Sequence, residues 1–254
     1  MAVWNARELL WSFVRRDLTV RYRHALLGVS WAILTPVLQS AIFTVIFARV
    51  ARIETGLPYP LYAFCGLAAW SFTSSALRSA VASLSGNAFL VSKVAFQREV
   101  LPLASVIVAA VDFAVALCVV GVLMWYFGVP LRATALALPL VILVQFAFTT
   151  GLALMLAAAN LLWHDVRYVF EVFVTLWMFA SAVLYPMPRL DGVAGAVLAL
   201  NPMTPIIEAY RDVLLRGVLP SSSTLGAAAV WAVAILVIGV ALFQRAEPRF
   251  AEMA

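Results

Sequence analysis

Lysine, histidine and cysteine are scarce in this chain of 254 residues. Its one lysine, Lys93, does not belong to a G-x-x-x-x-G-K-[ST] stretch, so the chain has no phosphate-cradling loop of its own. The two histidines, His24 and His164, lie far apart, and no H-E-x-x-H motif or cysteine–histidine cluster is present to hold zinc. Paired carboxylates at catalytic spacing are not evident either. The sequence therefore predicts no catalytic residue, no metal site and no cofactor bound by this chain.

Charge is scarce too, because only 11% of the residues are charged while 65% are hydrophobic. A soluble domain carries about 25% charged residues, and the mean hydropathy of +1.03 places this chain in a membrane. We interpret the net charge of +5 as basic residues that flank membrane spans, not as a nucleic-acid surface. Cys65 and Cys118 both lie inside apolar runs and are interpreted as small packing residues.

The predicted fold is an all-α polytopic membrane protein that forms a single transmembrane domain over residues 1–254. Apolar runs long enough to cross about 30 Å of hydrocarbon occur six times. These predicted spans are residues 26–48, 60–84, 101–126, 134–161, 169–185 and 225–243. Residues 1–24 are predicted to form an amphipathic helix in the membrane interface. Residues 186–223 are apolar but broken by prolines, which predicts a re-entrant helical hairpin on the extracytoplasmic side.

The orientation follows from the arginines. The stretch "RRDLTVRYRH", residues 15–24, places the densest positive cluster directly before the first predicted span. Positive charge favours the cytoplasmic side, so we predict that the N-terminus lies inside. Six spans then return the C-terminus to the cytoplasm.

Two observations within the spans allow more than one interpretation. Asp112 is an acid deep in a predicted span, where a carboxylate is a functional candidate, but an ion pair with Arg78 that ties two spans together is favoured. Aromatic residues are plentiful, and each one is either an ordinary packing or lipid-facing residue or part of a stacking surface for sugar rings. The residues considered for a channel lining are Phe43, Phe47, Trp177 and Phe179.

Three stretches resemble the permeases of ABC type-2 exporters for polysaccharides, the membrane subunits of O-antigen exporters of the Wzm type. "VRYRHALLGVSWAILTP" (residues 20–36) is similar to the start of the first span in that family. "NAFLVSKVAFQREVLPL" (residues 87–103) resembles its cytoplasmic loop between the second and third spans, and "NPMTPIIEAYRDVLLRG" (residues 201–217) its re-entrant region. The loop "WHDVRY" (residues 163–168) departs from the family, in which an arginine often precedes the aspartate.

The resemblance implies a half-transporter in a bacterial cytoplasmic (inner) membrane. Two copies of this chain would pair as a homodimer with two separate ATPase subunits, which would bind ATP and Mg²⁺. The pore would lie between the copies, lined by the first and fifth spans. The substrate would be a polysaccharide on a lipid anchor such as undecaprenyl diphosphate, and no nucleic acid is expected as a partner.

The resemblance also implies two groups of site residues. One is the ATPase-coupling surface, formed by Lys93, Phe96, Gln97, Arg98, Glu99, Asp165 and Arg167. The other is a lipid-diphosphate site at the cytoplasmic leaflet, formed by Arg15, Arg16, Arg21 and Arg23. Plain anchoring of these arginines to anionic headgroups explains the second group equally well, and an ordinary solvated loop is the alternative for the first.

Other functions also fit the sequence. A capsule or teichoic-acid exporter, or a permease for drugs or small lipids, would keep the same architecture and the same need for a partner ATPase. A membrane lipid-glycan transferase belongs to another class, because the chain alone would then turn over its substrate.

Overall fold

The structure, a computed structural model, describes residues 2–23, 30–46, 55–94, 96–186 and 201–250. Within these ranges the chain forms helices and no strand, which confirms the all-helical prediction. The α-helices are α1 (Ala2–Arg23), α2 (Ser30–Phe43), α3 (Tyr59–Val81), α4 (Ala88–Lys93), α5 (Val100–Tyr126), α6 (Leu138–Leu162), α7 (Val166–Ala180), α9 (Met203–Arg211) and α10 (Ser222–Ala246). Short 3-10 helices form η2 (Ser85–Asn87), η3 (Ala133–Ala137) and η5 (Glu247–Arg249), and η4 (Asp212–Arg216) is a π-helix.

Three helical segments among the described residues are long and apolar enough to cross a membrane. They are Val100–Tyr126, Ala133–Leu162 and Ser222–Arg249, and they match the spans predicted at 101–126, 134–161 and 225–243. The other three predicted spans contain shorter or less apolar helices: α2 has 14 residues, α7 has 15, and α3 has 23 but carries several serines. The structure therefore supports a membrane protein, while six crossings stay a prediction.

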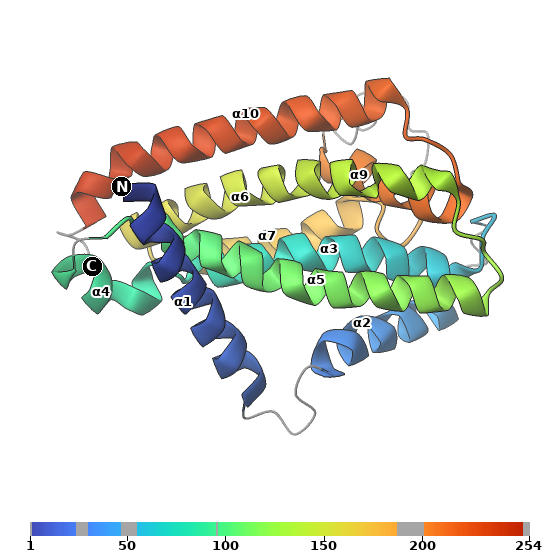
Figure 1. Cartoon of the computed structure of the whole chain (residues 1–254), viewed down its shortest axis with the longest axis horizontal. Coiled ribbons are helices and arrows are strands. Elements are labelled where there is room, and N and C mark those ends of the chain that lie inside the picture. Colours follow the sequence, from blue (N-terminus) through green and yellow to red (C-terminus); the bar gives the residue numbers. More distant parts are fainter. Residues whose placement is uncertain (1, 24–29, 47–54, 95, 187–200, 251–254) are drawn as a thin grey trace.

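The long helices lie side by side along the length of the molecule (Figure 1). α3 is central, because it packs against α5, α6, α2, α9 and α7, and nearly every residue of its first half, from Tyr59 to Trp70, is buried. α1 instead lies across the bundle against α5, near the end where α4 and both ends of the chain are found (Figure 1). We call this the charged end and the opposite one the far end.

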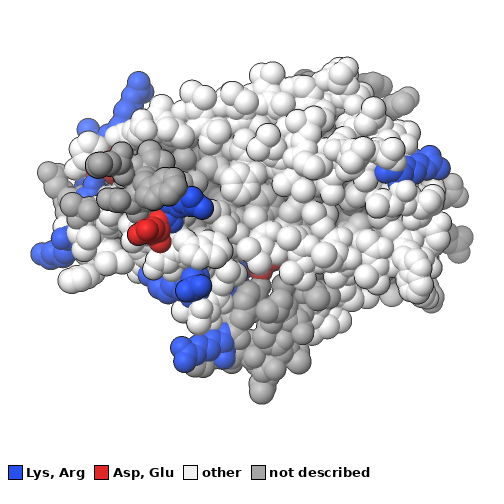
Figure 2. Space-filling model, in the orientation of Figure 1, with Lys and Arg blue, Asp and Glu red and all other residues white. Residues whose placement is uncertain are grey.

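Charge separates along the same axis. Figure 2 shows lysine and arginine gathered mainly at the charged end and a smaller group at the far end, with a wide band almost without charge between them. Such a band is what hydrocarbon requires of a membrane protein surface.

Two glycines let α6 and α10 approach at backbone distance. A Cβ atom built on Gly151 would lie 2.5 Å from the carbonyl oxygen of Ile235, and one on Gly239 would lie 2.9 Å from the Cα atom of Gly151. Close backbone approach through small residues is a main source of helix association in membranes, where burial of apolar surface gives little driving force.

The expected re-entrant region, residues 186–223, falls only partly within the described residues, since 187–200 lie outside them. Its second part forms α9, which packs against α3, α6 and α10, and η4, which packs against η3. Arg211, fully buried at the end of α9, donates hydrogen bonds to the carbonyl oxygens of Ala182 (2.9 Å) and Val183 (2.5 Å). The guanidinium thereby fixes the turn at which α7 ends.

Candidate transport path and partner-binding end

The loop expected to couple to an ATPase lies at the charged end and is organised by Arg98. Its Nε and Nη2 atoms donate to the carbonyl oxygen of Val91 at 3.2 and 3.0 Å, which holds the last turn of α4. Nη1 donates to the carbonyl oxygen of Glu247 at 3.4 Å and lies 3.9 Å from its carboxylate. Arg98 therefore joins α4 to the C-terminal segment and holds the expected coupling loop in place. Its guanidinium group is directed into the chain and not outward toward a partner protein.

The apolar residue that stands out from this surface is not the one expected from the sequence. Phe96 is half-buried and packs against Phe13 of α1, with ring centroids 6.3 Å apart. Phe89 on α4 is 73% exposed instead, and Lys93 and Gln97 beside it are also exposed. The sequence did not single out Phe89 as the exposed aromatic residue, although Phe89 belongs to the stretch "NAFLVSK" that resembles the family's cytoplasmic loop.

The second half of the expected coupling surface is tied to the first. Asn160, near the end of α6, donates to Ser85 Oγ (3.2 Å) and accepts a hydrogen bond from the backbone N–H of Arg167 (3.2 Å). The side chains of Asp165 and Arg167 are exposed. Asn160 therefore holds the start of α7 and the η2 turn together as one surface.

The arginines expected to meet a lipid diphosphate occupy different settings. Arg15 and Arg23 are exposed on α1. Arg16 bonds Asp17 (2.9 Å) and Asn87 (3.1 Å) and lies over the ring of Phe13. Arg21 is paired with Asp112 and donates to Ser79 at 3.4 Å, so it attaches the end of α1 to α5 and α3.

The prediction of an ion pair between Arg78 and Asp112 is wrong, because each of the two residues pairs with another side chain. Asp112 pairs with Arg21 of α1, and Arg78 pairs with Glu171 of α7 at 3.3 Å. The physical reason is the course of α1, which crosses α5 and carries its last turn to the depth of Asp112. Arg78 is thereby left for α7, and its side chain stays 48% exposed.

A polar stripe runs along one face of α3 in the half that is nearer to the charged end. Ser71, Ser74, Ser75 and Arg78 follow the i, i+3, i+4, i+7 spacing of one helix face, and the serines are half-buried while Arg78 is exposed. We call these four residues the serine stripe. Most of the apolar residues of α3 are buried, so this stripe is a polar and partly exposed face of the helix. The stretch "SFTSSALR" (residues 71–78) already contains this polar helix face in the sequence.

The aromatic residues expected in a channel have different surroundings. Trp177 packs edge-on against Trp70 (5.3 Å between centroids), and its indole N–H donates to Asn201 Oδ1 at 3.0 Å. It also lines an apolar cavity of about 500 Å³ formed by α3, α6, α7 and α10. Phe179 is 44% exposed and Phe43 is half-buried against the core, while Phe47 lies outside the described residues.

Comparison with known proteins gives one family. The profile of the family described as ABC-2 type transporter matches residues 8–215. An O-antigen export system permease protein, RfbA of Myxococcus xanthus, is 31% identical over 253 residues, which cover 98% of this chain and 96% of that protein. An RfbA protein of Klebsiella pneumoniae is 26% identical over 97% of this chain and 95% of its own length. A polysialic acid transport protein, KpsM of Escherichia coli, is 23% identical over 91% of both chains.

Proposed function

The chain belongs to the ABC-2 type transporter family, and from this premise we propose that it is the membrane subunit of an exporter for a lipid-linked polysaccharide of the O-antigen type. The observation that carries the proposal is its similarity, over nearly its whole length, to O-antigen export permeases from two organisms. The membrane character of the structure and its uncharged band support it. The anchor we propose is undecaprenyl diphosphate.

The proposed path for the glycan runs along the serine stripe, between two copies of the chain. Hydroxyls and the Arg78–Glu171 pair offer hydrogen bonds to sugar hydroxyls at a depth where lipid offers none. A second copy would cover this face and complete the path with its own stripe. Phe43 and Phe179 remain candidates for the lining next to it, and Arg15 and Arg23 for the lipid diphosphate.

The energy would come from a partner. Two ATPase subunits would bind ATP and Mg²⁺ and dock on the charged end, with Phe89 as the apolar knob and Lys93, Gln97, Asp165 and Arg167 around it. Arg98 and Asn160 would keep this surface rigid enough to transmit closure of the ATPase. We propose no catalytic group in this chain itself.

The proposed placement is a bacterial cytoplasmic membrane. The chain would form one transmembrane domain of six spans with both termini in the cytoplasm. The region that includes α9 would form a re-entrant hairpin on the extracytoplasmic side.

Complementation of a bacterium that lacks its own O-antigen export permease tests this function. The chain is expressed with the ATPase subunit of an O-antigen exporter, and O-antigen at the cell surface is measured by immunoblot and by antibody binding to intact cells. We expect export only when both proteins are present, together with ATP hydrolysis by the co-purified complex. Turnover of a lipid-linked sugar by the purified chain alone would contradict the proposal and indicate a transferase.

The docking surface is tested by Phe89→Ser, with Leu219→Ser as the matched control. Both side chains are exposed, 73% and 68%, but Leu219 lies at the far end, in the segment after η4. We expect Phe89→Ser to lower recovery of the ATPase in the co-purified complex at least ten-fold, as loss of an interface hot spot does, and Leu219→Ser to leave it unchanged. Equal recovery of the ATPase with the two variants would show that Phe89 is not part of the interface.

A capsule polysaccharide is the second candidate substrate, because the chain is also similar to a polysialic acid transport protein. The identity is lower, 23% against 31%, which places this candidate second. The complementation assay separates the two when it is repeated in a strain that lacks its capsule permease.

A further inference from the structure

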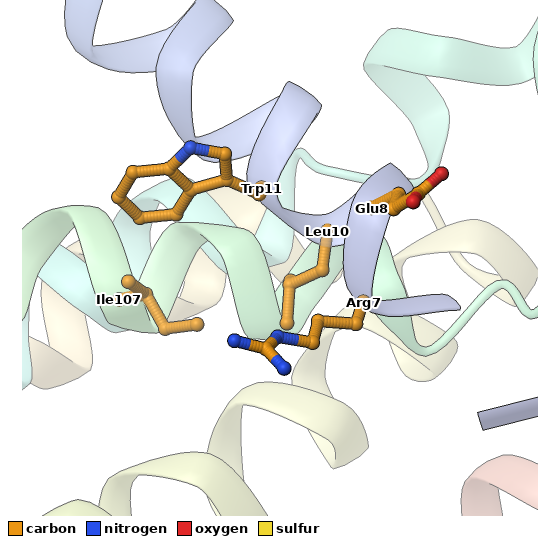
Figure 3. Close-up of a pocket in the computed structure, with 5 residues that line it drawn as sticks. All are labelled: Arg7, Glu8, Leu10, Trp11 and Ile107. Atoms are coloured by element: carbon orange, nitrogen blue, oxygen red, sulfur yellow. The ribbon is translucent and has the colours of Figure 1, made fainter. Parts of the chain in front are cut away.

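A second pocket lies between α1 and α5 at the charged end, and neither the serine stripe nor the α4 surface contributes to it. Its volume is about 500 Å³, and the described residues that line it are Arg7, Glu8, Leu10, Trp11 and Ile107. Figure 3 shows Leu10 and Trp11 on the α1 side and Ile107 on the α5 side. These three side chains give the pocket apolar walls.

The charge at this pocket is positive on its inner side. In Figure 3 the guanidinium of Arg7 is directed into the space beneath Leu10, while the carboxylate of Glu8 points away from it. An arginine fork matches the oxygens of a phosphate group. A pocket with apolar walls and one such fork therefore complements a ligand that is part hydrocarbon and part phosphate.

With Val100–Tyr126 taken as a membrane span, the pocket lies at the depth of the headgroup region. Ile107 comes seven residues after the start of α5 at Val100, about 10 Å along the helix. Trp11 is 59% exposed, and tryptophan favours the membrane interface, where its ring is in apolar surroundings and its N–H is near water. Both residues thus lie where a phospholipid places its phosphate and the first part of its acyl chains.

We propose that this pocket binds an anionic phospholipid of the surrounding leaflet, with its phosphate on Arg7 and one acyl chain against Leu10, Trp11 and Ile107. The occupant is a membrane lipid and not the anchor of the transported glycan, because the described residues that line the pocket belong to α1 and α5, whereas the serine stripe contacts α7 through Arg78. The bound lipid extends the contact of α1 with α5 beyond Phe13 and Val14, which are buried one turn further on.

Quenching of Trp11 fluorescence by brominated lipids tests the proposal in the full chain. The protein is reconstituted in phosphatidylcholine vesicles that contain a rising fraction of either dibrominated phosphatidylglycerol or dibrominated phosphatidylcholine. The chain has eight tryptophans, so the Trp11 signal is the difference between wild type and Trp11→Phe, which keeps an aromatic wall. We expect half-quenching at an about five-fold lower fraction of phosphatidylglycerol, the preference that one arginine near an anionic surface gives.

Arg7→Gln is expected to bring both lipids to the same half-quenching fraction. Arg245→Gln is the matched control, because it removes the same charge from an exposed arginine at the same end of the molecule, in α10, and it should keep the five-fold preference. Ile107→Phe fills the pocket from the α5 side and should weaken quenching by both lipids.

Three results would overturn the proposal. The first is equal quenching of the wild-type protein by the two lipids, which would exclude a preference for anionic lipid. A preference for phosphatidylglycerol that remains in the Arg7→Gln variant would show that the lipid phosphate does not bind at Arg7. Release of the quenching by millimolar inorganic phosphate would indicate a free-anion site instead of a lipid site. None of these results depends on export, so the proposal can fail while the proposed function stands.

Discussion

At the residue scale, the guanidinium of Arg211 connects three parts of the chain that are distant in sequence. It lies over the ring of Tyr62 at 3.6 Å, bonds the carbonyl oxygens of the 182–183 turn, and pairs with Glu208 at 2.6 Å. Glu208 also bonds Arg216 at 2.7 Å. A fully buried charge is tolerated only when it is paired and hydrogen-bonded in this way.

Gly66 on α3 makes room for this guanidinium, which gives a first prediction. A Cβ atom at this position would lie 2.5 Å from the carbonyl oxygen of Val183 and closer still to Nη2 of Arg211. We expect Gly66→Ala to lower the free energy of unfolding by about 1–3 kcal/mol, as overpacking does. Thermal unfolding of the purified chain checks it, with Gly121→Ala as the control, because a Cβ there meets nothing within 4 Å. Equal melting temperatures for the two variants would contradict the assignment.

Glu208 gives a prediction for pH. Burial raises the pKa of this carboxyl, but Arg211 and Arg216 outweigh burial and hold the pKa below its ordinary value of 4.5. A depressed pKa in the folded state means that the carboxylate stabilises the fold above pH 4.5 and that this stability is lost as the pH falls further. We expect the melting temperature of the wild type to fall below about pH 4.5.

The variant Glu208→Gln separates this group from other acids. At pH 7 it leaves the buried Arg211 without its charge partner, which costs about 3 kcal/mol or more. The variant should therefore melt at a lower temperature at pH 7 and show a flatter decline in acid than the wild type. Parallel curves for the two proteins between pH 3 and 7 would exclude Glu208 as the source.

At the element scale, α6 and α10 cross at a point where Gly151 and Gly239 let the two backbones touch. The Cβ atom of Gly239→Ala would meet the carbonyl oxygen and Cα atom of Gly151, which are backbone atoms that cannot turn aside. We expect this variant to lower the melting temperature by roughly 5 °C or more. Gly226→Ala, on the same helix with nothing within 4 Å of its Cβ, should leave it unchanged. Fluorescence-detected size-exclusion chromatography after heating measures both.

The elements themselves could largely be predicted from the sequence. The helix expected over 101–126 is observed at Val100–Tyr126, and the one expected over 60–84 at Tyr59–Val81. Long uncharged runs leave the chain few alternatives to a helix, since backbone groups in hydrocarbon must bond within the segment. Where α7 ends could not be predicted in this way, because Arg211 fixes that turn from 29 residues away in the sequence.

The sequence predicted the region in which the site residues lie, but not the residues that each of them contacts. The stretch 87–103 does lie at the charged end, yet Phe96 packs inward and Phe89 outward. Arg21 could not be assigned to Asp112 from hydropathy, because the pairing depends on the angle at which α1 crosses α5. Rotation and crossing angle of helices are tertiary properties, and a pattern of apolar residues along one helix carries little information about them.

At the scale of the whole molecule, the two ends of the bundle should lie on opposite sides of a membrane. α10 begins at Ser222 at the far end and ends at the charged end, where Gln97 also lies, and both side chains are exposed. In a background with Cys65→Ala and Cys118→Ala, single Ser222→Cys and Gln97→Cys variants can be labelled with a membrane-impermeant maleimide. Because the positive cluster favours the cytoplasm, we expect Ser222→Cys to react in intact spheroplasts and Gln97→Cys only after lysis. Reaction of both variants before lysis would contradict a crossing by α10. Reaction of Gln97→Cys alone before lysis would mean the opposite orientation, with the proposed ATPase surface outside the cytoplasm, where ATP is not available.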